Sequence, residues 1–210
     1  MEAFANPPMR GRHVSLRAVT ADDYGFLAAA QTTEAMVVRW RFRGSTPGPD
    51  RAHQSMWQNV LAQFLVVSTV SDRPIGLVAA YQPNFQDGHA HVAAARFDTR
   101  RSPLMILGNT LFLNYVFTCW DFHKLYMKLP EYNFPQIRTG LNRYFEVEGR
   151  LRDHYFYGGR RWDELVLAVY REPWMERARK RLSVELAGPP LPKATGQTVT
   201  LQVPPVPETP

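Results

Sequence analysis

The sequence has a single cysteine, Cys119, among its 210 residues, so no disulfide can form within one chain. A lone cysteine on an apolar segment is usually a packing residue rather than a nucleophile. Residues 1–13 contain no apolar run of the kind that forms a signal peptide. We therefore expect a cytoplasmic protein that does not depend on disulfides.

Long apolar runs and metal-ligand patterns are also absent. The most apolar stretch, residues 104–119, is shorter than a membrane-spanning helix and contains Asn109 and Asn114, so it predicts a buried core helix and not a membrane span. His89 and His91 resemble the start of a metal site, but no third ligand follows at a recognisable spacing. No metal cofactor is expected.

Charged residues and regular periodicity are scarce near the end of the chain. Residues 188–210 hold seven of the seventeen prolines and only two charged side chains, a composition typical of disordered segments. The remainder is rich enough in apolar residues, 45% of the whole chain, to bury one substantial core. The prediction is one domain over residues 1–187 and a disordered proline-rich tail over residues 188–210.

Positive charge is in excess, with 25 Lys and Arg against 19 Asp and Glu, a formal net charge of +6. Such a field favours acidic partners: nucleic acid, anionic lipid, a coenzyme A derivative or an acidic carrier protein. Residues 39–43 alternate arginine with aromatic residues, which suits single-stranded nucleic acid, yet no recognised nucleic-acid module accompanies them. The second arginine cluster, residues 177–181, is expected on the solvated face of a short helix after Pro173. Nucleic-acid binding therefore ranks low among the candidate functions.

The hydrophobic pattern predicts alternating helices and strands. A capping-box pattern at residues 20–23 predicts a helix start, and a second helix is expected over residues 56–63. Further helices are predicted from residue 104 and over residues 135–144. The predicted strands cover residues 64–69, 75–82, 89–97, 125–129, 151–157 and 164–170. The first three of these would form an antiparallel meander, and the whole order predicts an α/β (α+β) domain with a mixed, mostly antiparallel central sheet flanked by helices.

The junction between the strand at residues 89–97 and the helix from residue 104 has the residues of an anion site. Ser102 is placed as N-cap and Pro103 as first helical residue, and a helix N-terminus attracts anions. The sequence here resembles the GNAT acetyltransferase superfamily, whose members carry Q/R-x-x-G-x-G/A at this junction for the pyrophosphate of acetyl-coenzyme A. Arg100 fits the first position, but Pro103 and Met105 occupy both glycine places, so the loop is degenerate.

The resemblance extends over residues 12–174 and is closest to the branch that acetylates ribosomal-protein alanine N-termini. Its most specific part is the segment 145–152, followed by a Gly158-Gly159 turn and the segment 163–169. It implies the GNAT-type sheet and an N-acyltransferase that moves an acyl group from a pantetheine thioester to an amine by direct attack. The acceptor would be an amine-bearing small molecule or peptide, and a second copy of the chain is a candidate partner.

The missing glycines leave three possibilities: two kinds of acyl donor and a noncatalytic role. Two lost charge-assisted hydrogen bonds, at roughly 1.5 to 3 kcal/mol each, would weaken coenzyme A binding by about two to four orders of magnitude. Arg100, Arg101 and Ser102 are expected to bind donor phosphate in their place. The donor is then acyl-coenzyme A, or an acyl carrier protein whose phosphopantetheine has no pyrophosphate. The alternative is a noncatalytic GNAT-like module that binds a partner protein or nucleic acid.

The remaining site residues follow from the resemblance. Asn133 matches the asparagine beside the pantetheine arm, although helix capping would explain it equally well. Gln136 stands where many relatives have serine, and Gly140 where others have the tyrosine that protonates the leaving thiolate. Both familiar acid positions are therefore vacant.

Two histidines and a tyrosine are the candidates for proton transfer. His89 and His91 lie on one face of a strand that, by the resemblance, borders the cleft, so we expect His91, assisted by His89, to accept the proton of the attacking amine. The other possibility is that the histidines only cap the hairpin near Gly88. Tyr126 is a candidate acid, as are Tyr132 and Tyr144.

Overall fold

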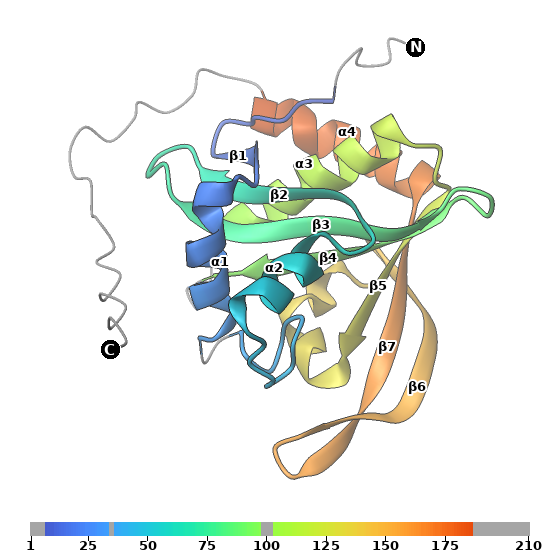
Figure 1. The fold of residues 1–210 in the computed structure, drawn as a ribbon. Helices are drawn as coiled ribbons and strands as arrows, with labels where there is room; N and C mark the ends of the chain where they lie inside the picture. The colour runs from blue at the N-terminus through green and yellow to red at the C-terminus, as the bar shows by residue number, and fades with distance from the viewer. Residues whose placement is uncertain (1–6, 34–35, 98–102, 187–210) are drawn as a thin grey trace.

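The computed structural model describes residues 7–33, 36–97 and 103–186 and contains one seven-stranded sheet in the order β1-β2-β3-β4-β5-β7-β6 (Figure 1). The strands are β1 (Val14–Ala18), β2 (Val60–Ser68), β3 (Pro74–Asn84), β4 (His89–Arg96), β5 (Lys124–Pro130), β6 (Glu146–Tyr157) and β7 (Arg160–Tyr170). Every neighbouring pair is antiparallel except β4 and β5, which run parallel. The predicted mixed, mostly antiparallel sheet is confirmed.

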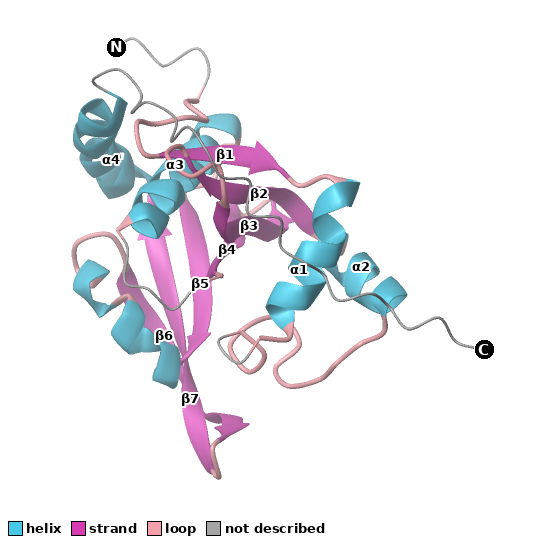
Figure 2. Cartoon of the chain, turned by 90° about the vertical axis from the view of Figure 1, so that its left-hand side faces the viewer, coloured by secondary structure: helices cyan, strands magenta, loops and turns pink. Residues whose placement is uncertain are grey.

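In the described residues, four α-helices cover the two faces of the sheet. They are α1 (Tyr24–Gln31), α2 (Pro49–Trp57), α3 (Leu104–Cys119) and α4 (Arg171–Leu186), with short 3-10 segments η1 (Ala21–Asp23), η2 (Glu131–Gln136) and η3 (Arg138–Gly140). Figure 2 shows α3 and α4 on one side of the sheet and α1 and α2 on the other. None of the helices in the described part of the chain is both long and apolar enough to cross a membrane.

Strand alternation divides the apolar residues between two cores. Ala90 and Val92 of β4 point into the larger core, where they pack with residues of α3 and α4. The smaller core joins Leu27 of α1 and Met56 of α2 to the opposite face of β2 and β3. Because side chains alternate along a strand, His89 and His91 lie on the α1 and α2 side.

The N-terminal helix begins at the predicted capping box. The backbone N–H and the hydroxyl of Thr20 both donate to Asp23 Oδ2, at 2.9 and 3.1 Å. Arg17 of β1 forms a two-pronged ion pair with the same carboxylate, at 2.7 and 2.9 Å. One carboxylate therefore starts the helix and ties it to the edge strand.

Two of the predicted helices are wrong. The helix expected over residues 56–63 ends at Trp57, because Asn59 adopts a left-handed conformation (φ 55°) and the chain then enters β2, where Gln63 pairs with Ala79 of β3. The helix expected over residues 135–144 is instead the end of η2, with Pro135 inside it, followed by η3. Proline removes a helical hydrogen bond, so no regular α-helix forms there.

The C-terminal elements are longer than predicted. Strand β6 begins at Glu146 and β7 at Arg160, and their hairpin extends beyond the body of the sheet (Figure 1). Helix α4 runs to Leu186, and its Trp174 and Leu182 are buried against α3. The fold thus reaches past residue 174, where the family resemblance ends. The boundary at residue 187 and the disorder of the tail stay predictions, because residues 187–210 lie outside the described residues.

Candidate active site

Strands β4 and β5 separate to form a cleft. They pair at only three positions, of which His91 with Tyr126 is the last. Beyond it β4 stays with β3, pairing up to Arg96, and β5 stays with β7, pairing up to Pro130. A cavity of about 1060 Å³ occupies the opening and is lined by residues 92–96 of β4 and 127–130 of β5. The strand edges that face it are of the kind that hold an extended ligand by its backbone-like groups.

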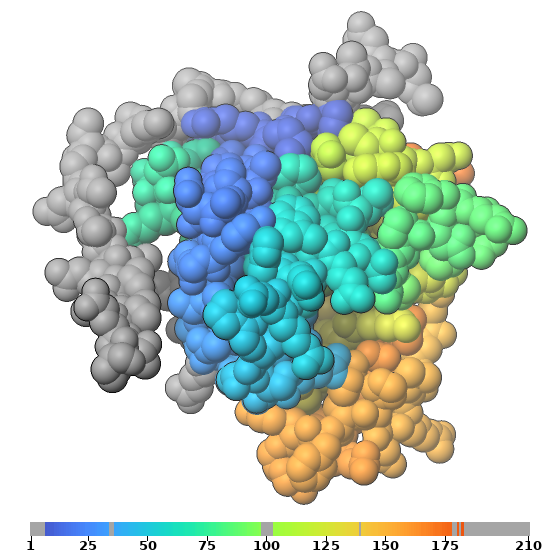
Figure 3. Space-filling view, in the orientation of Figure 1, coloured from blue at the N-terminus to red at the C-terminus, as the bar shows by residue number. Residues whose placement is uncertain are grey.

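A segment of consecutive turns, residues 36–44, lies over this cavity, and we call it the cover segment. It is held by its own hydrogen bonds, from Trp40 N–H to the Met36 carbonyl (2.9 Å) and from Gly44 N–H to the Val37 carbonyl (2.6 Å). Arg43 donates to Tyr155 Oη at 2.6 Å, and in Figure 3 the blue-to-cyan surface of this region borders the orange hairpin. The cover segment therefore closes one side of the cavity against β6.

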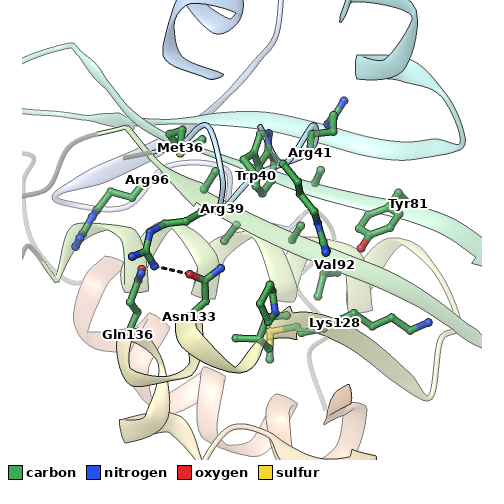
Figure 4. Close-up of a pocket in the computed structure, with 18 of the residues that line it drawn as sticks. Met36, Arg39, Trp40, Arg41, Tyr81, Val92, Arg96, Lys128, Asn133 and Gln136 are labelled. Carbon is green, nitrogen blue, oxygen red and sulfur yellow. Dashed lines mark hydrogen bonds between the residues drawn. The ribbon is translucent and has the colours of Figure 1, made fainter. Parts of the chain in front are cut away.

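The arginine and aromatic cluster noted in the sequence is part of this segment and lines the cavity. Arg39 donates to Asn133 Oδ1 at 2.5 Å, a contact that joins the cover segment to η2 (Figure 4). Arg41 is half-buried and donates to the Ser55 carbonyl (2.7 Å) and to Gln63 Oε1 (3.2 Å). Burial lowers the pKa of Arg41. Both arginines thus make contacts within the fold, and the low rank given to nucleic-acid binding stays a prediction.

The cavity wall is positively charged. Its described lining includes the cationic residues Arg39, Arg41, Arg43, Arg96 and Lys128, and no aspartate or glutamate. The described part of the wall therefore has no carboxylate to balance these positive charges. A field of one sign in a confined space favours anionic ligands.

His91 lies at the closed end of the cleft, beside the cavity and not in its lining. Its ring stands 5.6 Å, centroid to centroid, from both Tyr81 and Tyr126. Burial lowers the pKa of His91, and the positive charges of Lys128 and His89 lower it further, while Glu164 opposes them. The Nδ1 atoms of His89 and His91 are buried and have no hydrogen-bond partner within the described residues. His91 therefore has a free ring nitrogen and a preference for the neutral form.

The predicted acid Tyr126 does not line the cavity. Its ring lies between the two histidines, 5.4 Å from His89, and its hydroxyl interacts with Lys124 and Glu148. Tyr132 donates to the Val38 carbonyl at 3.0 Å, and Tyr144 packs on Trp174. None of these three tyrosines lines the cavity.

Tyr81 is a cavity-lining residue that the sequence analysis missed. It stands directly opposite His91 in the antiparallel pair of β3 and β4, and burial raises its pKa, so it keeps its proton at neutral pH. The hairpin register could have indicated it, since a residue paired with His91 shares its face of the sheet. Arg41 was not predicted as a site residue either. Its position in the cavity depends on a contact with Gln63, 22 positions away along the chain, which the sequence does not reveal.

The predicted donor residues are only partly described. Asn133 and Gln136 line the cavity, whereas Arg100, Arg101 and Ser102 lie outside the described residues. Pro103 is the N-cap of α3 and not its first helical residue. Met105 does not line the cavity. Its side chain packs against Gly76 instead, and a Cβ on Gly76 would lie 2.3 Å from Met105 Sδ.

Two further expectations concern cysteine and metal. Cys119 is exposed at the end of α3 and not packed in the core, and partial desolvation of its thiol raises its pKa. A raised pKa makes a thiol a poorer nucleophile. Within the described ranges, His, Cys, Asp and Glu form no group of three that could hold a metal ion.

Of the comparisons with known proteins, only the one with solved structures finds similar proteins, and it identifies the fold. No protein-family model matches the sequence, and no curated protein is significantly similar to it. Among solved structures, a chimera of spermidine N-acetyltransferase SpeG from Vibrio cholerae and hSSAT superposes with a TM-score of 0.66 at 19% identity, covering 79% of this chain and 99% of that one. A GCN5-related N-acetyltransferase from Brucella melitensis gives 0.67 at 21% identity, covering 85% of each chain.

A probable acetyltransferase of the GNAT family from Chromobacterium violaceum is also similar, with a TM-score of 0.63 at 17% identity, covering 83% of this chain and 91% of that one. The chain therefore has the fold of the GNAT N-acetyltransferases, and the resemblance inferred from its motifs is confirmed at the level of the fold. The ribosomal-protein-alanine branch stays a prediction.

Proposed function

We propose that this protein is an N-acyltransferase that moves an acyl group from a pantetheine thioester to an amine by direct attack. The observation that supports this most is the separation of β4 and β5 after His91 and Tyr126, which opens onto a cavity of about 1060 Å³. A pantetheine arm is an extended chain with amide groups, so it fits such an opening as an added strand would.

The donor is acyl-coenzyme A or an acyl carrier protein. Arg96 at the end of β4 and Asn133 and Gln136 on η2 lie where the arm would pass, and Arg100 and Arg101 follow Arg96 in the sequence as further phosphate ligands. Pro103 has no N–H to offer at the start of α3. Arginine side chains would accordingly carry more of the phosphate recognition than backbone amides do.

The amine would attack from the α1 and α2 side of the sheet. His91, which lies beside the cavity, is our candidate to accept its proton through an intervening water, because burial favours the neutral imidazole. The protonated Tyr81 hydroxyl lines the cavity beside it and is a candidate donor to the leaving thiolate. Backbone N–H groups at the open strand edges would stabilise the developing oxyanion.

A noncatalytic module that binds a partner protein or nucleic acid is the second candidate. The specific observation in its favour is Pro103 at the N-cap of α3, where a backbone donor is missing. A module of this kind would keep the fold and the basic surface without turning over a thioester.

Thiol release from acetyl-coenzyme A and from an acetylated carrier protein, each with a panel of amines, tests the proposal. We expect amine-dependent release and an N-acetylated product by mass spectrometry. Mass spectrometry of the freshly purified protein and a thermal shift with coenzyme A provide a second readout. No release with either donor, together with no bound thioester and no shift, would favour the binding module.

A further inference from the structure

Arg41 is a half-buried cation that has no carboxylate partner within the described residues. Two of its N–H groups are fixed by the Ser55 carbonyl and Gln63 Oε1, both neutral acceptors. Gln63 is only 5% exposed, and its Nε2 is itself buried and unpartnered. Figure 4 shows the guanidinium and the Tyr81 hydroxyl directed toward one another. This part of the wall is therefore rich in hydrogen-bond donors and poor in acceptors.

Arg41 is separate from the path proposed for the donor. Its two anchors belong to α2 and β2, and Tyr81 belongs to β3. In the strand order β2 and β3 lie on the far side of β4 from β5, whereas the donor arm would lie between β4 and β5. A charge at this position therefore lies in the part of the cavity where the acceptor amine would bind.

We propose that the acceptor amine carries an anionic group, a carboxylate or a phosphate, which Arg41 binds, an inference that rests on the acyltransferase function proposed above. A guanidinium presents paired N–H donors that match the oxygens of both anions. Arg43 and Lys128 add positive charge to the same cavity. The site thus selects an acidic amine, with the amino group directed toward the closed end of the cleft.

A polycationic amine does not fit this wall. A polyamine would bring several positive charges into a cavity with five cationic side chains and no described carboxylate, and like charges in a confined site repel strongly. Several of the structural neighbours are spermidine or spermidine/spermine N-acetyltransferases. We infer that this chain shares their fold but takes the opposite charge class of acceptor.

Paired amines that differ only in the anion test this directly. With one donor at fixed concentration, kcat/KM is measured for O-phosphoethanolamine against ethanolamine, for β-alanine against β-alaninamide, and for spermidine. We expect the acidic member of at least one pair to be preferred by roughly 10- to 100-fold, and spermidine to be the poorest acceptor. The pair with the larger preference identifies phosphate or carboxylate as the group bound.

Arg41→Gln should remove most of this preference, and Arg41→Lys should retain part of it. Arg73→Gln is the matched control, since Arg73 is exposed on the β2–β3 turn outside the cavity lining, and it should keep the wild-type preference. Transfer to neutral amines or spermidine as efficient as to acidic ones would overturn the inference and leave the proposed function standing.

Binding in the absence of a donor separates the two proposals. Calorimetric titration of O-phosphoethanolamine, ethanolamine, β-alanine and β-alaninamide should show tighter binding of an acidic member, lost in Arg41→Gln and kept in Arg73→Gln. This result together with no transfer to any amine would contradict the acyltransferase function and still support an anion site at Arg41. Equal binding within both pairs would overturn the anion site.

Discussion

At the scale of single residues, His91 is the group whose chemistry is most sharply defined. Burial and two neighbouring positive charges lower its pKa below the ordinary 6.5, so it is neutral at pH 7 and can accept a proton. If it is the base, the rate should fall as the pH drops through that lowered value, because the protonated imidazole can no longer accept. His91→Ala should lower turnover per folded molecule by about 10² to 10⁴ and remove this acid limb.

The measurement is kcat between pH 5 and 9, corrected for the folded fraction, with donor affinity followed separately. His53→Ala is a suitable control, because His53 is exposed on α2 and does not line the cavity. If His91→Ala keeps both the rate and the pH profile, the base is water or another residue, and Tyr126 and His89 return as candidates.

Gly76 makes room for the side chain of Met105, one of the two residues that stand in the glycine places of the family loop. A Cβ at this position would lie 2.3 Å from Met105 Sδ and 2.4 Å from the Ala95 carbonyl oxygen. Gly76→Ala should therefore lower the free energy of unfolding by about 1 to 3 kcal/mol, as overpacking does. Urea denaturation measures this, and adding Met105→Ala should recover only part of the loss because the carbonyl clash remains.

Gly25→Ala is the matched control for Gly76. A Cβ at Gly25, inside α1, would meet nothing within 4 Å, so alanine should be neutral or stabilising there, given its higher helix propensity. Equal destabilisation by both substitutions would mean that packing against Met105 is not what requires glycine at position 76.

At the scale of elements, the capping box is where local sequence determines structure most directly. The hydrogen bonds from Arg17, and then those from Thr20, lower the pKa of Asp23. A carboxyl whose pKa is lower in the folded state stabilises the fold above its unfolded pKa, near 3.9, and this contribution is lost as the pH falls through the folded value. Asp23→Asn should cost about 1 kcal/mol at pH 7 and less at pH 2.

Stability is measured by denaturation at both pH values. The matched substitution Asp22→Asn, on the exposed side of the same turn, should leave the pH dependence as in the wild type. A pH-independent cost of Asp23→Asn would assign its effect to packing and not to the ion pair with Arg17.

Elements with a strong local signal were predicted correctly, and those decided by tertiary contacts were not. The meander, α3 and the capping box follow from periodicity and from Thr20 and Asp23. Residues 60–63 are compatible with either a helix or a strand by pattern, and pairing with β3 decides for the strand. The cover segment was not predicted at all, because its contact between Arg39 and Asn133 joins residues 94 positions apart.

At the scale of the whole molecule, the order of motifs along the chain predicted the sheet and the cleft, while the charge of the site needed three-dimensional structure. The net charge of +6 is compatible with many acidic partners. Among the described residues, the fold gathers five cationic side chains around one cavity, and only this placement links the charge to a particular site. The histidine pair was located by strand alternation, but the lowered pKa of His91 depends on its burial and on Lys128 from another strand, which only the folded structure shows.

The same charge leads to a prediction about the donor. A carrier-protein thioester should outperform the same acyl group on coenzyme A, because the N-cap Pro103 lacks the N–H that a pyrophosphate would use and a positive surface steers an acidic carrier to the cleft. Competition of the two donors for one amine, followed by mass spectrometry of the products, measures the preference directly. An acyl-pantetheine without phosphate serves as control for the arm alone.

Ionic strength separates steering from local contacts in that competition. Charges farther apart than about 8 Å are largely screened at 0.15 M salt, so the advantage of the carrier should shrink as salt rises, whereas binding of the pantetheine arm in the cleft should change little. A preference that is independent of salt would assign donor choice to the cleft itself. Equal or better use of coenzyme A at low salt would contradict the prediction and imply that arginine side chains fully replace the missing glycine loop.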